Sequence, residues 1–220
     1  MEGHPQLRQY YGIFRFLYSL KITLTYPSIQ AFHERMGANS GDWFVALSNG
    51  KDVPQLKAGL YMVSPNNPDS VHNQNSMHLA AIHELTHFFI FKKAQGDLPI
   101  WMHEGIANFE AGKFGTNKAY FKTKSIDHMA EIWETQGIPT LSMLSTLDSD
   151  VFCEIGGYAF SYTLIEFIVQ RWNFETLLKL IQRFDRFEEI LGVTQDSFEA
   201  DWRAFVTERY LVHHRWATQK

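Results

Sequence analysis

One five-residue segment, His83-Glu84-Leu85-Thr86-His87, constrains this chain more than any other feature. It lies in an apolar stretch, from Leu79 to Ile90, that is hydrophobic on nearly every side of a helix. Residues four apart lie on the same face of a helix, so both imidazoles can reach one ion. Two histidines and a glutamate are costly inside an apolar helix unless something pairs with them. The segment therefore predicts a deeply buried helix, from about Ser76, that carries a metal site at His83 and His87.

Zinc is the expected ion, because it suits neutral nitrogen donors and takes three protein ligands plus water at catalytic sites. Glu84 follows the first histidine and can act as general base toward that water. A bound Zn²⁺ ion also lowers the pKa of water and polarises a carbonyl group. The pattern thus predicts one zinc ion with a catalytic carboxylate beside it.

The residues that follow the motif exclude the metzincin class of zinc peptidases. That class continues along the same helix with a glycine and a third histidine. The corresponding positions here are Ile90 and Lys93. The third ligand must therefore come from elsewhere in the chain.

A carboxylate from a separate downstream helix is the other known arrangement, and Glu104 is the best candidate for it. Asp97 and Glu110 compete for the role. Asp97 lies in a turn, where it is more simply interpreted as the cap of the next helix. Glu110 lies almost two turns beyond Glu104, nearer the end of that helix. A solvated carboxylate in the first helical turn is the alternative interpretation of Glu104.

Composition and charge place the chain among ordinary folded domains. It has 220 residues, 45% of them hydrophobic, and a net charge of −4 without a basic stripe, so we expect no nucleic-acid partner. The apolar stretch from Tyr10 to Tyr26 is interrupted by Arg15 and Lys21, so we expect no membrane span. The N-terminus lacks a signal-peptide pattern, and the single cysteine, Cys153, slightly favours a reducing compartment; localisation stays open.

The hydrophobic pattern predicts an α+β fold: a small N-terminal β-sheet over the buried active-site helix, followed by a mainly helical C-terminal half. We expect one domain, 1–220, with an α/β part over about 1–95 and a helical part over about 96–220. The expected strands are 43–48 and 59–64. The expected helical segments are 7–36 (with a separate short helix at Ile29–Met36), Ser76 to about Gly96, Ile100–Ala111, 156–171, 174–187 and 195–212.

The segment Trp101–Glu110 resembles the Trp-Leu-Asn-Glu-Gly-Phe-Ala-x-Tyr-x-Glu segment of aminopeptidase-N-like gluzincins. From about residue 43 onward the chain is similar to the peptidase MA-like family, which includes thermolysin-like enzymes. The resemblance implies a thermolysin-like (zincin) catalytic fold. It also implies that Glu104, the glutamate before Gly105, is the third zinc ligand.

The same resemblance implies an oxyanion-stabilising tyrosine at the start of a later helix, and Tyr158 matches that position. Ser161 stands where the family usually has a glycine, and Tyr162 is the fallback for the role. A phenol that donates to developing negative charge is the physical need. Asn108, one turn after Glu104, is where related enzymes often have aspartate. Its carbonyl oxygen can accept the second N–H of a metal-bound histidine, and exposed polar surface is the alternative.

Gluzincins commonly bind an extended peptide along the edge strand that precedes the active helix, which implies substrate contacts near Tyr61 and Met62 on 59–64. The element with which aminopeptidases grip a free amine is absent there, which favours an endopeptidase. The expected function is a zinc-dependent peptidase acting on a peptide or protein, of unknown oligomeric state. The alternatives are a catalytically silent, zinc-stabilised binding or regulatory module, and a chain that binds no metal.

Overall fold

The computed structural model describes residues 23–37, 45–49, 56, 59–64, 66–67, 74–114, 118–146 and 148–212. The chain divides into two compact units, Met1–Lys92 and Lys93–Lys220. The described part is mostly helical with one three-stranded sheet, so the expected α+β class is confirmed. The expectation of one domain over 1–220 stays a prediction. The first part of the helix expected over 7–36, up to residue 22, lies outside the described residues.

The first unit contains the sheet, formed by β1 (Thr23–Tyr26), β2 (Ala46–Asn49) and β3 (Gly59–Val63) in the order β1-β3-β2. Strand β1 runs parallel to β3, with Thr23 opposite Leu60, and β2 runs antiparallel to it. The prediction of helix over 23–26 is therefore wrong. The β-branched threonines and the tyrosine of this segment fit a strand, but only the distant partner β3 makes it one.

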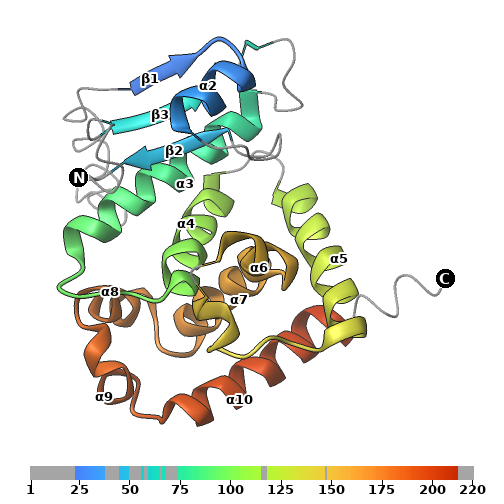
Figure 1. Ribbon diagram of the computed structural model, residues 1–220. Helices are drawn as coiled ribbons and strands as arrows, with labels where there is room; N and C mark the ends of the chain where they lie inside the picture. Colours follow the sequence, from blue (N-terminus) through green and yellow to red (C-terminus); the bar gives the residue numbers. More distant parts are fainter. Residues whose placement is uncertain are drawn as a thin grey trace, which may run out of the picture. The chain divides into compact units, whose positions relative to one another are not determined.

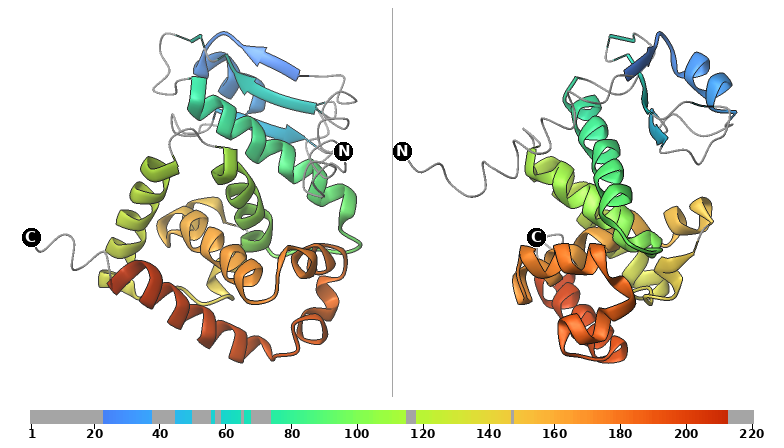
Figure 2. Two further views of the ribbon diagram at one scale, coloured as in Figure 1. Left: turned by 180° about the vertical axis from the view of Figure 1, so that it is seen from behind. Right: turned by 90° about the vertical axis from the view of Figure 1, so that its left-hand side faces the viewer.

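Two helices cover the two faces of this sheet, α2 (Ile29–Met36) and α3 (Gln74–Lys93) (Figures 1 and 2). Helix α2 has the predicted bounds, because Ser28 caps its first turn and Gly37 ends it in the left-handed conformation at φ 66°. All five residues of β3 are buried between the helices. The core of the unit includes Phe32, Val45, Leu60, Tyr61, Met62, Val63 and Met77, with Ala80, Ala81 and Leu85 of α3 packed against it.

Helix α3 carries the histidine motif and is less buried than its sequence predicts. Met77, Phe88 and Ile90 are buried, but most residues from 79 to 86 are only half-buried, and Phe91 is 49% exposed. The prediction of a helix deep in the core is thus confirmed for the helix and only in part for its burial.

The second unit is helical and is built around α7 (Gly157–Arg171) (Figure 1). Most residues of α7 are buried. Helices α4, α5, α6, α8 and α10 all contact α7. The elements around it are α4 (Ile100–Phe114), α5 (Lys118–Gln136), η1 (Met143–Ser145), α6 (Ser149–Glu154), α8 (Phe174–Gln182), η2 (Phe184–Arg186), α9 (Phe187–Leu191), α10 (Gln195–Val206) and η3 (Thr207–Leu211).

Several helix ends in this unit differ from those that the sequence predicts. Helix α4 continues through Gly112 to Phe114, because a glycine inside a helix weakens it without ending it. The helix expected over 174–187 ends at Gln182, and η2 and α9 follow. Helices α5 and α6 were not expected. Among the helices that the structure describes, none is long and apolar enough to cross a membrane.

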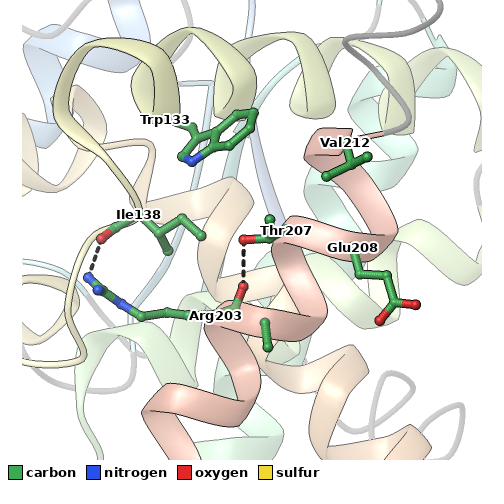
Figure 3. A pocket seen from close by; sticks show the side chains of 7 residues that line it. Trp133, Ile138, Arg203, Thr207, Glu208 and Val212 are labelled. Carbon is green, nitrogen blue, oxygen red and sulfur yellow. Dashed lines mark hydrogen bonds between the residues drawn. The ribbon is translucent and has the colours of Figure 1, made fainter.

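A groove of about 750 Å³ lies between the end of α5 and the C-terminal turns of α10 and η3 (Figure 3). Arg203 forms part of its wall and donates through Nη2 to the carbonyl oxygen of Ile138, while Thr207 donates to the carbonyl oxygen of Arg203 at 2.8 Å. The lining residues are Trp133, Ile138, Arg203, Ala204, Thr207, Glu208 and Val212. They include no histidine or cysteine, and Glu208 is the one carboxylate among them.

Candidate metal centre

The two histidines of α3 face one another across one helical turn. Their Nε2 atoms lie 3.2 Å apart, and their ring centroids are 4.8 Å apart with the rings at 80°. Only 9% of His87 is exposed, and His83 is half-buried. Two imidazole nitrogens directed at one another suit a shared cation, because both can donate lone pairs to it. The i, i+4 geometry predicted from the sequence is confirmed.

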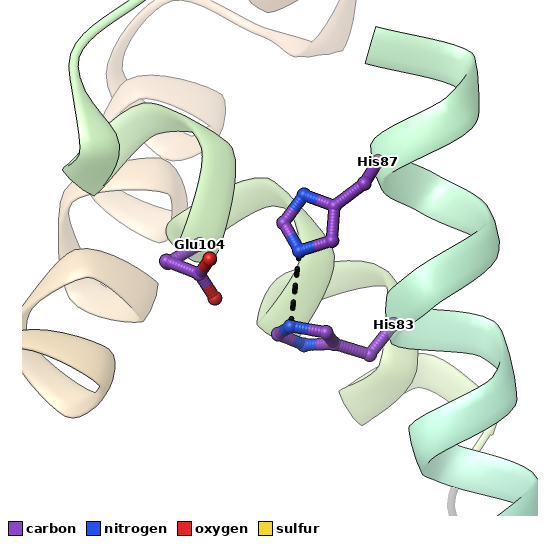
Figure 4. Close-up of side chains that lie close together, drawn as sticks. All are labelled: His83, His87 and Glu104. Carbon is purple, nitrogen blue, oxygen red and sulfur yellow. Dashed lines mark hydrogen bonds between the residues drawn. The ribbon is translucent and has the colours of Figure 1, made fainter. Parts of the chain in front are cut away.

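Glu104 lies in the first turns of α4, one residue before a buried glycine. The ligand atoms of His83, His87 and Glu104 all lie within 4.8 Å of one another, so these three residues can hold a metal ion (Figure 4). Within the described parts of the chain, no other set of three or more histidine, cysteine or acidic residues forms such a cluster. Neither Asp97 nor Glu110, the competing candidates, belongs to it.

The donor set fits zinc. In a tetrahedral zinc site, with Zn–N bonds of 2.0–2.1 Å, two nitrogen ligands lie about 3.3 Å apart. The 3.2 Å between the two Nε2 atoms is close to that value. Two imidazoles and one carboxylate are also the ligands of one known class of catalytic zinc site. The chemistry of these three side chains therefore agrees with the ion that the sequence predicts.

Glu84 is held by the sheet of its own unit. Its Oε2 atom accepts a hydrogen bond of 2.7 Å from the backbone N–H of Ser48 in β2. The carboxylate of the candidate general base is therefore fixed by a main-chain donor. Ser48 was missed by the sequence analysis, and no signal in the sequence identifies it, because the contact joins residues 36 positions apart.

The edge strands of the described sheet are β1 and β2, and the prediction that 59–64 is the edge strand is wrong. Strand β3 is central and pairs with β1 on one side and β2 on the other. Tyr61 and Met62, expected near the substrate, are 1% and 8% exposed and belong to the core. A hydrophobic strand with both edges paired and both faces covered has no edge left for a peptide.

The hydrogen-bond pattern shows which backbone groups of β2 face outward. Val63 donates to the carbonyl oxygen of Val45 at 2.8 Å, and Ala46 lies opposite Met62. Because paired groups alternate along an antiparallel ladder, Ala46 and Ser48 direct their N–H and C=O groups away from β3. The bond from Ser48 to Glu84 lies on this outer edge.

Tyr158 is the second residue of α7 in the second unit and is half-buried, whereas the residues on both sides of it are buried. Its ring meets that of Phe152 edge to face, with centroids 5.1 Å apart. Asn108 of α4 donates through Nδ2 to the backbone carbonyl oxygen of Tyr158 at 3.3 Å. The acceptor role predicted for Asn108 toward a metal-bound histidine stays a prediction.

Tyr162, the fallback for Tyr158, lies one turn further along α7. Its pKa is raised to about 12, chiefly by burial and then by the nearby carboxylate of Glu166. Glu166 is 7% exposed and accepts hydrogen bonds from Tyr210 and, at 3.0 Å, from Arg209. Burial first, and then its bond to Glu166, also raise the pKa of Tyr210. This cluster ties η3 to α7, and only the folded chain reveals it.

No protein-family model, no curated protein and no solved structure matches this chain.

Proposed function

We propose that this protein is a zinc-dependent peptidase of the gluzincin type, with a thermolysin-like catalytic fold. His83, His87 and Glu104 would hold the ion, Glu84 would act as general base, and Tyr158 would stabilise the oxyanion. The observation that carries the proposal is the cluster of the two histidines and Glu104, whose ligand atoms lie within 4.8 Å of one another. Glu84, adjacent to His83 and oriented by a main-chain bond, supports a catalytic use of that cluster.

The proposed reaction is hydrolysis of a peptide bond. A bound zinc ion would lower the pKa of a water molecule and polarise the substrate carbonyl. Glu84 takes the proton of the attacking water as its oxygen bonds to the carbonyl carbon. Tyr158 donates a hydrogen bond from its hydroxyl group to the oxyanion and keeps its proton. Glu84 then gives the proton to the amide nitrogen, the C–N bond breaks, and a carboxylic acid and an amine leave.

The outer edge of β2 is the proposed docking strand for an extended peptide. Ala46 presents both an N–H and a C=O group there, which is the main-chain pairing that strand addition needs. Ser48 presents its C=O to the same edge, while its N–H is bonded to Glu84. An endopeptidase is the favoured form of this activity.

The test measures zinc content and peptide cleavage together. The purified protein, loaded with one equivalent of zinc, is assayed against casein and a quenched fluorescent peptide library. Glu84→Gln should keep the zinc and lower kcat by at least about 100-fold, since general-base catalysis contributes 10²–10⁴-fold. Glu134→Gln, the same change at an exposed position of α5, is the matched control and should cleave as the unmodified protein does.

Each outcome decides between the candidate functions. Zinc bound in stoichiometric amount without any cleavage would support a silent binding or regulatory module. Cleavage that survives Glu84→Gln would contradict the proposed mechanism. Failure to retain zinc at all would support a chain without a metal site.

A further inference from the structure

We propose that Asn108 is a positioning residue that fixes Tyr158 relative to the helix carrying Glu104. The inference rests on the proposed function, because it concerns the oxyanion donor of that reaction. It differs from the acceptor role toward a histidine, since it uses the amide nitrogen of Asn108 and not its carbonyl oxygen. All of its evidence lies within the second unit.

Helices α4 and α7 touch at the level of their backbones beside Glu104. A Cβ atom built on Gly105 would lie 2.4 Å from the backbone oxygen of Ser161 and 2.8 Å from Cγ1 of Ile165. Such a close approach requires glycine at 105. The metal-ligand position of α4 and the first turns of α7 are therefore in direct contact.

Asn108 continues this contact one turn further along α4, on the same face as Glu104. Its Nδ2 donates to the carbonyl oxygen of Tyr158 at 3.3 Å. In a regular helix that oxygen also accepts the N–H of the residue four positions on. A carbonyl oxygen has two lone pairs, so the bond from Asn108 adds a restraint without breaking the helical ladder.

Helix α6 also contacts Tyr158. The Phe152 ring packs edge to face against Tyr158 at 5.1 Å, and a Cβ atom on Gly157 would lie 2.5 Å from the backbone oxygen of Phe152. Gly156 makes the turn between the helices at φ 69°. Asn108 restrains the backbone of Tyr158 and Phe152 restrains its ring, as a preorganised donor requires.

The chemistry explains why asparagine suits this position. An ionised aspartate has no N–H, and a carboxylate next to a carbonyl oxygen brings two acceptors together. Asparagine has nearly the same shape and supplies the donor. The change Asn108→Asp therefore removes the bond with little change in volume.

The first arm of the test is a double-mutant cycle on peptide cleavage by the zinc-loaded protein. We expect Asn108→Asp to lower kcat by about 10-fold, with KM and zinc content unchanged, and Tyr158→Phe to lower kcat by about 100-fold, as for loss of one oxyanion donor. In the Tyr158→Phe background, Asn108→Asp should lower kcat less than about 2-fold, because the group it positions is gone. Full multiplication of the two effects would overturn the proposal.

The second arm needs no activity. The protein is labelled with 3-fluorotyrosine, and Tyr158→Phe assigns the ¹⁹F resonance of Tyr158. Asn108→Asp and Asn108→Ala should both shift or broaden that resonance. Gln136→Glu, an amide-to-carboxylate change at an exposed position of α5, is the control and should leave it in place.

The two arms separate the failure of this inference from the failure of the proposed function. If the unmodified protein cleaves nothing but the resonance moves, the peptidase is wrong and the positioning contact stands. If the resonance is unchanged in both Asn108 variants, the positioning role is wrong whatever the activity. If Asn108→Asp does not fold, Asn108→Ala replaces it in both the double-mutant cycle and the ¹⁹F measurement.

Discussion

The backbone N–H of Ser48 donates a hydrogen bond of 2.7 Å to Oε2 of Glu84. The donor belongs to the outer edge of β2 and the acceptor to α3, the helix that carries His83 and His87. One contact therefore joins the two features that the proposed peptidase needs from its first unit, an edge strand and a general base. It also fixes the direction of one carboxylate oxygen.

The change Ser48→Pro removes this N–H and tests its role. Proline is tolerated on an edge strand where the N–H points outward, so the sheet should survive. We expect kcat to fall by about 10-fold or more with zinc still bound, because Glu84 loses its orienting donor. Peptide cleavage and zinc content measured on the same preparation check this.

Two neighbouring variants are the controls. Ser48→Ala keeps the N–H and should be fully active. Leu47→Pro removes an N–H that faces β3 and should destabilise the sheet. Full activity of Ser48→Pro would show that the bond to Glu84 has no catalytic role.

Removal of a metal ligand should abolish zinc binding. We expect His87→Ala to raise the dissociation constant for zinc by more than about 100-fold, since changes beyond the ligands themselves already weaken binding 10–100-fold. The rise in Tm on adding zinc should vanish with it. His78→Ala, at an exposed position of the same helix, is the control and should bind zinc normally. Competition titration with a chromophoric chelator measures both.

Two glycines of α4 should respond to alanine with opposite signs. Gly105→Ala places Cβ 2.4 Å from the backbone oxygen of Ser161 and should lower the free energy of unfolding by about 2 kcal/mol. At Gly112 the nearest atom, a ring carbon of Tyr162, is 3.5 Å away, which is an ordinary contact. Gly112→Ala should therefore raise the free energy of unfolding by up to about 1 kcal/mol through helix propensity.

Urea unfolding followed by circular dichroism measures both glycine variants. Equal stability of Gly105→Ala and the unmodified protein would contradict the close approach of α4 and α7.

Stability should decline with pH in a window set by Tyr162, the half-buried tyrosine of α7. The pKa of Tyr162 is raised from 10.0 to about 12, mainly by burial. Because the folded state holds this proton more tightly than the unfolded state, the stabilisation is complete below pH 10 and is lost as pH rises toward 12. Tyr162→Phe should flatten the decline, as measured by urea unfolding at pH 8, 10 and 11. An unchanged slope would contradict the assignment to Tyr162.

Local signals in the sequence predicted the elements that local chemistry determines. Ser28 and Gly37 mark the two ends of α2, and the apolar run at 59–64 predicted the bounds of β3 to within one residue. Long-range pairing decided the rest. Thr23–Tyr26 lies in a segment predicted as helix, yet it is a strand because it pairs with Leu60–Val63. The order of strands, and hence which of them is the edge, depends on that same pairing and has no local signature.

The candidate site divides in the same way. His83, Glu84 and His87 were predictable because one helix sets their spacing, and Glu104 because its segment resembles a known family. The residues that orient the candidate catalytic groups could not be predicted from the sequence. Ser48 reaches Glu84, and Phe152 reaches Tyr158, only through tertiary packing. Asn108 was identified from its position one turn after Glu104, but its bond to the carbonyl oxygen of Tyr158 was not foreseen.

The central claim is that one zinc ion is held by His83, His87 and Glu104. Anomalous diffraction from crystals of the zinc-loaded protein, recorded on both sides of the zinc absorption edge, tests it most directly. The account predicts a single strong peak within bonding distance of both Nε2 atoms and of the Glu104 carboxylate. The absence of a peak there, or a peak held by other residues, would contradict it.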